Sequence, residues 1–146
     1  MGRLEEGEEM SWKGKSVLVT GANGFVGSWV AKALVDRGAD VVAIIRDIHP
    51  KYQPAYQEGA MAGLAGLVRG DITAYEEVAR AFNEYSVEFC FHLAAQAIVG
   101  AANRAPLSTF ETNINGTWNV LEAARSTGTL KGLVVASSDK AYGEHE

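Results

Sequence analysis

The sequence has one cysteine and three prolines among its 146 residues, and the scarcity of cysteine is informative. A lone Cys90 cannot form an intrachain disulfide, which excludes a disulfide-rich secreted scaffold. It lies in the apolar run 87–91, a setting that favours a small buried side chain over a nucleophile. We therefore expect a reducing, cytoplasmic location.

Long hydrophobic runs and an excess of basic charge are also absent. No stretch approaches the ~20 apolar residues of a membrane-spanning helix. The 13 Lys and Arg are outnumbered by 18 Asp and Glu, for a net charge of -5, whereas nucleic-acid binding needs a basic face. Residues 1–9 are acidic and lack the apolar core of a signal peptide. We expect neither membrane nor nucleic acid as a partner, and interpret residues 1–10 as a disordered leader.

Hydrophobic residues make up 47% of the chain, enough for the core of one domain over residues 11–146. Apolar periodicity alternates between strand and helix, which predicts a Rossmann-like, doubly wound parallel α/β sheet. No His, Cys or carboxylate pair has metal-ligand spacing on one predicted face, so no metal is expected. The predicted strands are 16–20, 40–45, 64–69, 87–94 and 130–136, and the predicted helices are 25–37, 74–85 and 106–127, with Thr73 as the N-cap of the second helix.

The last predicted helix, 106–127, is the longest. Its apolar residues recur three and four positions apart, which indicates one continuous stripe. We interpret this stripe first as a face packed on the core. Its members are Leu107, Phe110, Ile114, Thr117, Leu121 and Ala124.

The strongest local signal is a glycine turn between the first strand and the first helix, Thr-Gly-Ala-Asn-Gly-Phe-Val-Gly over residues 20–27. Gly21 permits a tight turn, Gly24 leaves space for a pyrophosphate, and Gly27 lets helix and strand pack closely. The helix N-terminus then offers free N–H groups to phosphate. The spacing is G-x-x-G-x-x-G rather than the G-x-G-x-x-G of most Rossmann dehydrogenases.

These residues resemble the extended short-chain dehydrogenase/reductase family, whose T-G-x-x-G-F-x-G fingerprint is matched in full. Three further marks agree in order and spacing: Gly-Asp-Ile at 70–72, Phe-His-Leu-Ala-Ala-Gln at 91–96, and Asn-Ile-Asn-Gly-Thr at 113–117. The resemblance covers residues 12–142. It implies a nicotinamide dinucleotide, with Asp71 near adenine, residues 93–96 beside the cofactor, and a homodimer contact through the 106–127 helix.

A ribose-binding acid is expected about 20 residues beyond the glycine motif. Asp47 fits that distance, which favours NAD, whereas the neighbouring Arg46 could meet the 2′-phosphate of NADP. His92 is interpreted as structural. The expected cofactor-binding residues are Gly21, Asn23, Gly24, Phe25, Val26, Gly27, Arg46, Asp47, Asp71, Ile72, Leu93, Ala94, Ala95 and Gln96.

Within the family the sequence resembles nucleotide-sugar 4,6-dehydratases, CDP-glucose 4,6-dehydratases in particular, through segments 12–15, 24–29 and 137–142. The resemblance implies hydride transfer at the sugar C4 followed by loss of water. It implies that Ser138 bonds the C4 oxygen, that Asp139 is the general acid, and that Lys140 holds the position of the base in other dehydratases. Other extended members, such as GDP-mannose dehydratase or a UDP-sugar 4-epimerase, stay open as alternatives.

The family's catalytic Tyr-x-x-x-Lys pair is not matched here, because Glu146 stands four residues after Tyr142. The resemblance places that pair, and a C-terminal substrate domain, further along than these 146 residues. The sequence therefore resembles a cofactor-binding portion truncated after about five strands, expected to be inactive alone. A dinucleotide-binding module without catalysis is a further hypothesis.

Overall fold

The computed structural model describes residues 11–47, 63–138 and 142–143. These form a five-stranded parallel sheet in the order β3-β2-β1-β4-β5. After β3 the chain crosses to the other side of β1, where β4 and β5 lie. The loops that follow β2 and β4 therefore leave the carboxyl edge of the sheet on opposite sides of β1. The strands are β1 Ser16–Thr20, β2 Asp40–Ile45, β3 Gly66–Arg69, β4 Phe89–His92 and β5 Gly132–Val135.

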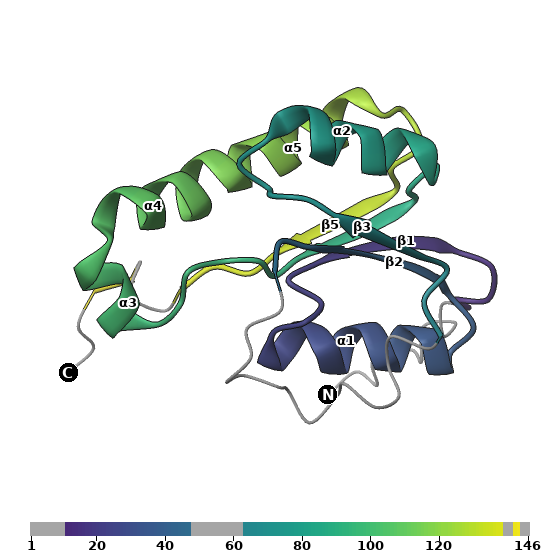
Figure 1. Cartoon of the computed structure of the whole chain (residues 1–146). Helices are drawn as coiled ribbons and strands as arrows, with labels where there is room; N and C mark the ends of the chain where they lie inside the picture. The colour runs from purple at the N-terminus through teal and green to yellow at the C-terminus, as the bar shows by residue number, and fades with distance from the viewer. Residues whose placement is uncertain (1–10, 48–62, 139–141, 144–146) are drawn as a thin grey trace, which may run out of the picture.

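Helices cover both faces of this sheet, as Figure 1 shows, which confirms the predicted Rossmann-like α/β class. α1 lies on one face, and α2 and α5 lie together on the other. No helix in the described ranges is long and apolar enough to cross a bilayer. The helices are α1 Phe25–Asp36, α2 Tyr75–Glu84, α3 Val99–Arg104, α4 Pro106–Phe110, the π-helical turn η1 Glu111–Asn115, and α5 Gly116–Ser126.

The core consists of two layers, one on each face of the sheet. Successive strand residues point to opposite faces, so Val17 and Val19 pack with Leu34 of α1, whereas Leu18 packs with Phe82 of α2. Both layers are anchored by β1 at the centre of the sheet. The carboxyl end of β1, where the glycine turn begins, is therefore fixed from both sides.

β1 and β2 have the predicted boundaries, and the boundaries of β3, β4, β5, α1 and α2 differ from prediction by at most two residues. β4 is the clearest case, because it spans Phe89–His92 rather than 87–94. The predicted cap of α2 was wrong. The N-cap is Ala74, whose methyl side chain cannot form a cap bond. The Thr73 hydroxyl donates to Asp71 Oδ1 at 2.9 Å and does not cap the helix.

The predicted helix over 106–127 is confirmed as one helical run from Pro106 to Ser126. The π turn η1 within this run and the short helix α3 before it were not predicted. The predicted stripe is mostly exposed rather than packed on the core, since Leu107, Phe110, Ile114 and Leu121 face outward. The physical reason is that α4 and η1 extend beyond the sheet (Figure 1), while α5 buries another face through Val120 and Ala123.

Candidate functional site

Two of the three glycines in the turn are required by close packing. Gly21 has φ of +69°, and a Cβ there would lie 2.8 Å from the backbone N of Ala94. A Cβ on Gly27 would lie 2.1 Å from the carbonyl oxygen of Gly21. These contacts let the β1 turn, the first turn of α1 and the exit of β4 meet at one point.

Gly24 is different, because an added Cβ there would be in tight contact with one backbone atom rather than in a severe clash. Its φ is -83°, and an added Cβ would meet only the Gly21 carbonyl oxygen, at 3.1 Å. Gly24 is the N-cap of α1, makes no side-chain cap bond, and is followed by no acid in the first turn. The N–H groups and positive end of α1 are thus left for an external anion.

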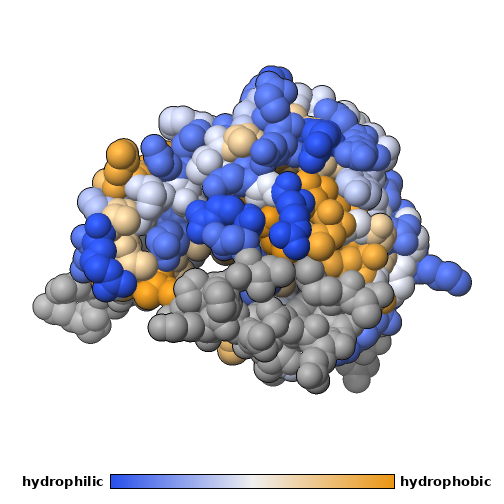
Figure 2. Space-filling view, in the orientation of Figure 1, coloured by the Kyte–Doolittle hydropathy of each residue, from blue (hydrophilic) through white to orange (hydrophobic). Residues whose placement is uncertain are grey.

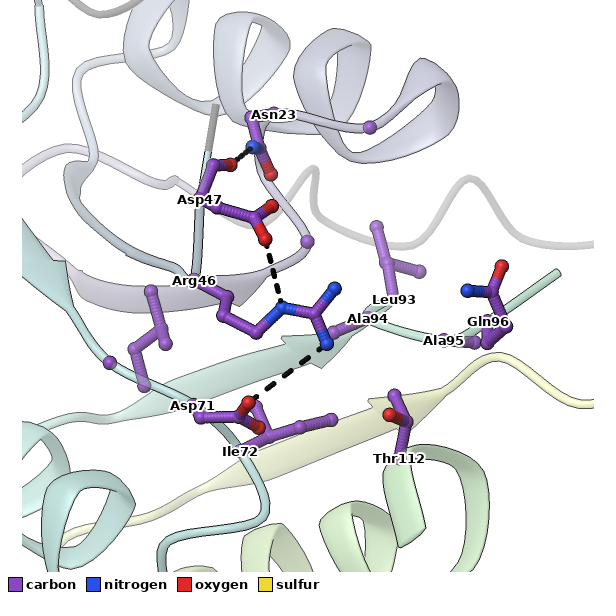
Figure 3. A pocket seen from close by; sticks show the side chains of 14 residues that line it. Asn23, Arg46, Asp47, Asp71, Ile72, Leu93, Ala94, Ala95, Gln96 and Thr112 are labelled. Atoms are coloured by element: carbon purple, nitrogen blue, oxygen red, sulfur yellow. Dashed lines mark hydrogen bonds and ion pairs between the residues drawn. The ribbon is translucent and has the colours of Figure 1, made fainter. Parts of the chain in front are cut away.

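A pocket opens over this turn, and Figure 3 shows it from close by. Five segments that are distant in sequence converge on it: the glycine turn, the carboxyl ends of β2, β3 and β4, and the π turn η1. Its lining residues are Gly21, Asn23, Gly24, Ile44, Arg46, Asp47, Gly70, Asp71, Ile72, Leu93, Ala94, Ala95, Gln96 and Thr112.

Most of the residues expected to bind the cofactor therefore lie together, but three do not line the pocket. Gly27 is buried under the turn, and the side chains of Phe25 and Val26 are 81% and 58% exposed. Sequence reasoning missed Ile44, Gly70 and Thr112. Gly70 belongs to the Gly-Asp-Ile motif and Thr112 directly precedes the Asn-x-x-Gly-Thr motif, so these motifs could have indicated both residues. For Ile44 the sequence indicated only a position in a strand.

The pocket is polar where β2 and β3 end. Arg46 Nε lies 3.2 Å from Asp47 Oδ2, and Arg46 Nη1 lies 3.9 Å from Asp71 Oδ2. Figure 3 shows the guanidinium reaching between the two carboxylates. The Asn23 amide donates to the Asp47 carbonyl at 2.7 Å, which ties the glycine turn to the end of β2. The charge of Arg46 is thus largely balanced within the pocket.

The segment after β4 forms the opposite wall. The backbone N–H of Gln96 donates to Asn113 Oδ1 at 2.7 Å, and Asn113 Nδ2 donates back to the Gln96 carbonyl at 3.2 Å. Asn119 donates to the carbonyls of Ile72 and Thr73, both at 3.0 Å. Side chains of η1 and α5 therefore hold two of the loops that line the pocket.

Two groups singled out in the sequence are buried near this site. Burial raises the pKa of the Cys90 thiol to about 12, in keeping with a hydrophobic core role. His92 is buried at the end of β4, and burial lowers its pKa. Among the described residues, no cluster of His, Cys, Asp or Glu could hold a metal ion.

The expected catalytic residues are only partly within the described ranges. Ser138 follows β5, is exposed, and is not among the residues that line the pocket. Asp139 and Lys140 lie outside the described residues, so their expected roles stay predictions.

Comparisons with known proteins identify the family of this chain. The model of the NAD dependent epimerase/dehydratase family matches residues 17–146. The chain is 35% identical over 135 residues to CDP-glucose 4,6-dehydratase of Salmonella typhimurium, covering 92% of this chain and 37% of that protein. It is 37% identical over 137 residues to UDP-glucuronate 4-epimerase 1 of Arabidopsis thaliana, covering 91% and 32%.

Solved structures give the same result. A UDP-glucose 4-epimerase of Stenotrophomonas maltophila with bound NAD and formylated UDP-arabinopyranose superposes with a TM-score of 0.77 at 30% identity, covering 90% of this chain and 39% of that one. A UDP-glucose 4-epimerase of Thermus thermophilus in complex with NAD gives 0.69 at 35% identity, covering 84% and 37%. The chain thus spans about two fifths or less of these relatives, and it belongs to the NAD dependent epimerase/dehydratase family.

Proposed function

We propose that this chain is the NAD-binding portion of a nucleotide-sugar 4,6-dehydratase or 4-epimerase. The observation that carries the proposal is the convergence of the glycine turn with the ends of β2, β3 and β4 on one pocket. The two solved structures named above contain NAD, and the residues here fit such a ligand.

The pyrophosphate is proposed to lie over Gly24 at the N-terminus of α1. That end has no acidic residue in its first turn and no side-chain cap, so its N–H groups favour an anion. Phe25 and Val26 do not line the pocket, and they are proposed to contribute their backbone N–H groups rather than their side chains. Asp71 and Ile72 are proposed to contact the adenine, and residues 93–96 to pass beside the rest of the cofactor.

A pair of glycine variants tests this placement. Gly24→Val should put a branched side chain into the phosphate space and abolish NAD binding. Because its Cβ would also lie 3.1 Å from the Gly21 carbonyl oxygen, urea unfolding of the variant is measured beside its NAD affinity. Gly100→Val is the matched control, since a Cβ at Gly100 meets only Arg104 Nη1, at 3.7 Å. Unchanged calorimetric affinity in Gly24→Val would reject the proposal.

NAD is proposed to be preferred over NADP. Asp47 lies at the end of β2, where a carboxylate can accept hydrogen bonds from a ribose and repel a 2′-phosphate. Arg46, the residue that could bind this phosphate, is already paired with Asp47 and Asp71. Titration with both cofactors tests the preference, and tighter NADP binding would make Arg46 the selector instead.

The reaction of the whole protein is proposed to start with oxidation at the sugar C4. The nicotinamide supplies the hydride chemistry when bound, and the protein positions the groups and handles the protons. Ser138 is proposed to hydrogen-bond the C4 oxygen, Asp139 to be the general acid, and Lys140 to stand at the position of the base. A Lys acts as a base only with a lowered pKa.

Relatives of both kinds, a 4,6-dehydratase and 4-epimerases, match this chain to a similar degree. The Asp-Lys pair at 139–140 is the feature that favours the dehydratase. The two reactions are distinguished by incubating the full-length protein with NAD and CDP-glucose or UDP-glucuronate. A 4-keto-6-deoxy sugar indicates the dehydratase, and inversion at C4 without loss of water indicates the epimerase.

A homodimer through residues 106–127 and a cytoplasmic location complete the proposal. Leu107, Phe110 and Trp118 are 71%, 62% and 58% exposed along this helix, and Figure 2 shows hydrophobic residues at the end of the molecule that carries α3 and α4. An apolar stripe of this kind typically marks a protein interface. Phe110→Glu with Trp118→Glu should shift the sedimentation coefficient from dimer to monomer, whereas Trp29→Glu on α1 should not.

A further inference from the structure

A chain of buried hydrogen bonds connects the end of β1 to the helix that borders the pocket. Thr20 and His92 are register partners at the ends of β1 and β4, and both are almost fully buried. Thr20 Oγ1 lies 2.7 Å from His92 Nδ1, and His92 Nε2 lies 3.0 Å from Thr117 Oγ1. Neither Thr117 nor His92 lines the pocket.

The direction of the first bond follows from what else Thr20 contacts. The backbone N–H groups of Leu93 and Ala94 donate to Thr20 Oγ1 at 3.2 and 3.1 Å. The oxygen thus serves as an acceptor for the chain leaving β4, and its only proton points to His92 Nδ1. A hydroxyl has one donor proton, so Nδ1 must be the acceptor and carries no proton.

The second bond has an equally defined direction. The Thr117 hydroxyl donates to the Asn113 carbonyl at 2.8 Å, so its oxygen is left to accept from His92 Nε2. His92 is therefore neutral with its proton on Nε2, since a second proton on Nδ1 would face the hydroxyl proton of Thr20. Burial, which lowers the pKa of His92, acts in the same direction.

The two ends of this chain anchor the two ends of one pocket wall. Thr20 holds Leu93 and Ala94, and Asn113 holds Gln96 through both atoms of its side-chain amide. His92 and Thr117 are the connection between these anchors. The wall formed by residues 93–96 is thus fixed to β1 at one end and to η1 at the other.

We propose that His92, as the neutral Nε2–H tautomer, is a positioning residue that sets the 93–96 wall for the cofactor through Thr20 and Thr117. This inference rests on the proposed function only for the identity of the ligand. The relay acts on the pocket without contacting it. Breaking its far end should therefore weaken cofactor binding, although Thr117 itself does not line the pocket.

Thr117 offers the mildest way to break the relay. Thr117→Val keeps the shape and removes the hydroxyl, and Thr117→Ser restores the hydroxyl. Thr129→Val is the matched control, because the Thr129 hydroxyl also donates to a backbone carbonyl, that of Val87 at 2.9 Å, but away from the pocket. For each variant of the 146-residue chain we would measure NAD affinity by calorimetry, amide exchange of Ala94 and Gln96 by NMR, and the ring ¹⁵N shifts of His92.

We expect Thr117→Val to weaken NAD binding about fivefold, the effect of one lost hydrogen bond, and to speed exchange of the Gln96 amide. Thr117→Ser and Thr129→Val should stay near wild type in both, and the ring shifts of the wild type should show the Nε2–H tautomer. An Nδ1–H or protonated ring, or equal effects of Thr117→Val and Thr129→Val, would overturn the relay. A wild-type chain that fails to bind NAD would reject the proposed function, while the tautomer and the Gln96 exchange would still decide the relay.

Discussion

Two helices begin at the same edge of the sheet, and their first turns are built in opposite ways. α1 begins behind Gly24 with Phe25, Val26 and Gly27, and has no acid in its first turn. α2 begins with Tyr75, Glu76 and Glu77, and the Glu77 carboxylate accepts the backbone N–H of Asp71 at 2.7 Å.

Under the proposed function, the difference separates a helix end that binds a ligand from one that stabilises the fold. Acids in the first turn of α2 compensate the positive end of the helix within the chain itself. At α1 the same compensation is absent, and the pocket lies over that end. The first turn of α1 thus carries no compensating negative charge of its own. Four experiments test this difference between α1 and α2.

The largest change in stability is expected at Gly27, the third residue of α1. The third residue of α2 is Glu77. Gly27→Ala would place a Cβ 2.1 Å from the Gly21 carbonyl oxygen, so backbone must shift. We expect unfolding to become easier by at least about 3 kcal/mol, the upper part of the range for overpacking. Gly100→Ala is the control and should change the unfolding free energy by less than about 1 kcal/mol in urea denaturation. Equal stability of the two variants would contradict the packing role of Gly27.

NAD binding should also slow the reaction of the buried Cys90 thiol with an alkylating reagent. Burial raises the pKa of Cys90 to about 12, so the native thiol is unreactive and alkylation reports unfolding. NAD at a hundred times its Kd should slow alkylation about 100-fold, as followed by mass spectrometry. An alkylation rate that is the same with and without NAD would mean that the ligand does not stabilise the native state.

Giving α1 the acid that α2 has should change affinity and stability in opposite directions. Val26→Glu puts a carboxylate at the second helical position, where Glu76 stands in α2. We expect about tenfold weaker NAD binding, by repulsion of the pyrophosphate, together with a gain of ~0.3–1 kcal/mol in stability from the helix dipole. Val26→Gln is the uncharged control for calorimetry and thermal unfolding. A variant that lost both affinity and stability would point to a packing defect instead.

The smallest effect is expected at α2. Glu77→Ala leaves the Asp71 N–H without its acceptor and should cost about 1 kcal/mol of stability in urea unfolding. Glu76→Ala, in the same turn, should cost less, since only the interaction with the helix dipole is lost. If Glu76 proved the more important of the two, the interpretation of Glu77 as a backbone anchor would be wrong.

The glycine turn shows which parts of the molecule could be predicted. The roles of Gly21 and Gly27 follow from a local pattern between a strand and a helix, and the structure confirms the close contacts expected of them. The parallel sheet follows from the same alternation. The family resemblance was confirmed by the comparisons.

The long helix shows where prediction failed. Its periodicity defines a stripe, but the pattern does not say which surface the stripe faces, and Leu107 and Phe110 extend past the sheet. The π turn at η1 has no local signal. Ile44 was missed for a related reason, because whether a strand residue lines a pocket depends on how distant loops approach it.

The most direct test of the account is a map of amide chemical-shift changes in the chain on titration with NAD. The account predicts that the largest changes occur at the first turn of α1 and at the pocket walls, including Gly24, Phe25, Val26, Asp71 and Ala94. The second turn of α2 and the opposite edge of the sheet, including Arg80, Glu88 and Lys131, should stay unchanged. Changes centred on the α2 helix or on that opposite edge, or no changes at saturating NAD, would contradict the claim that the free end of α1 is the site of the dinucleotide.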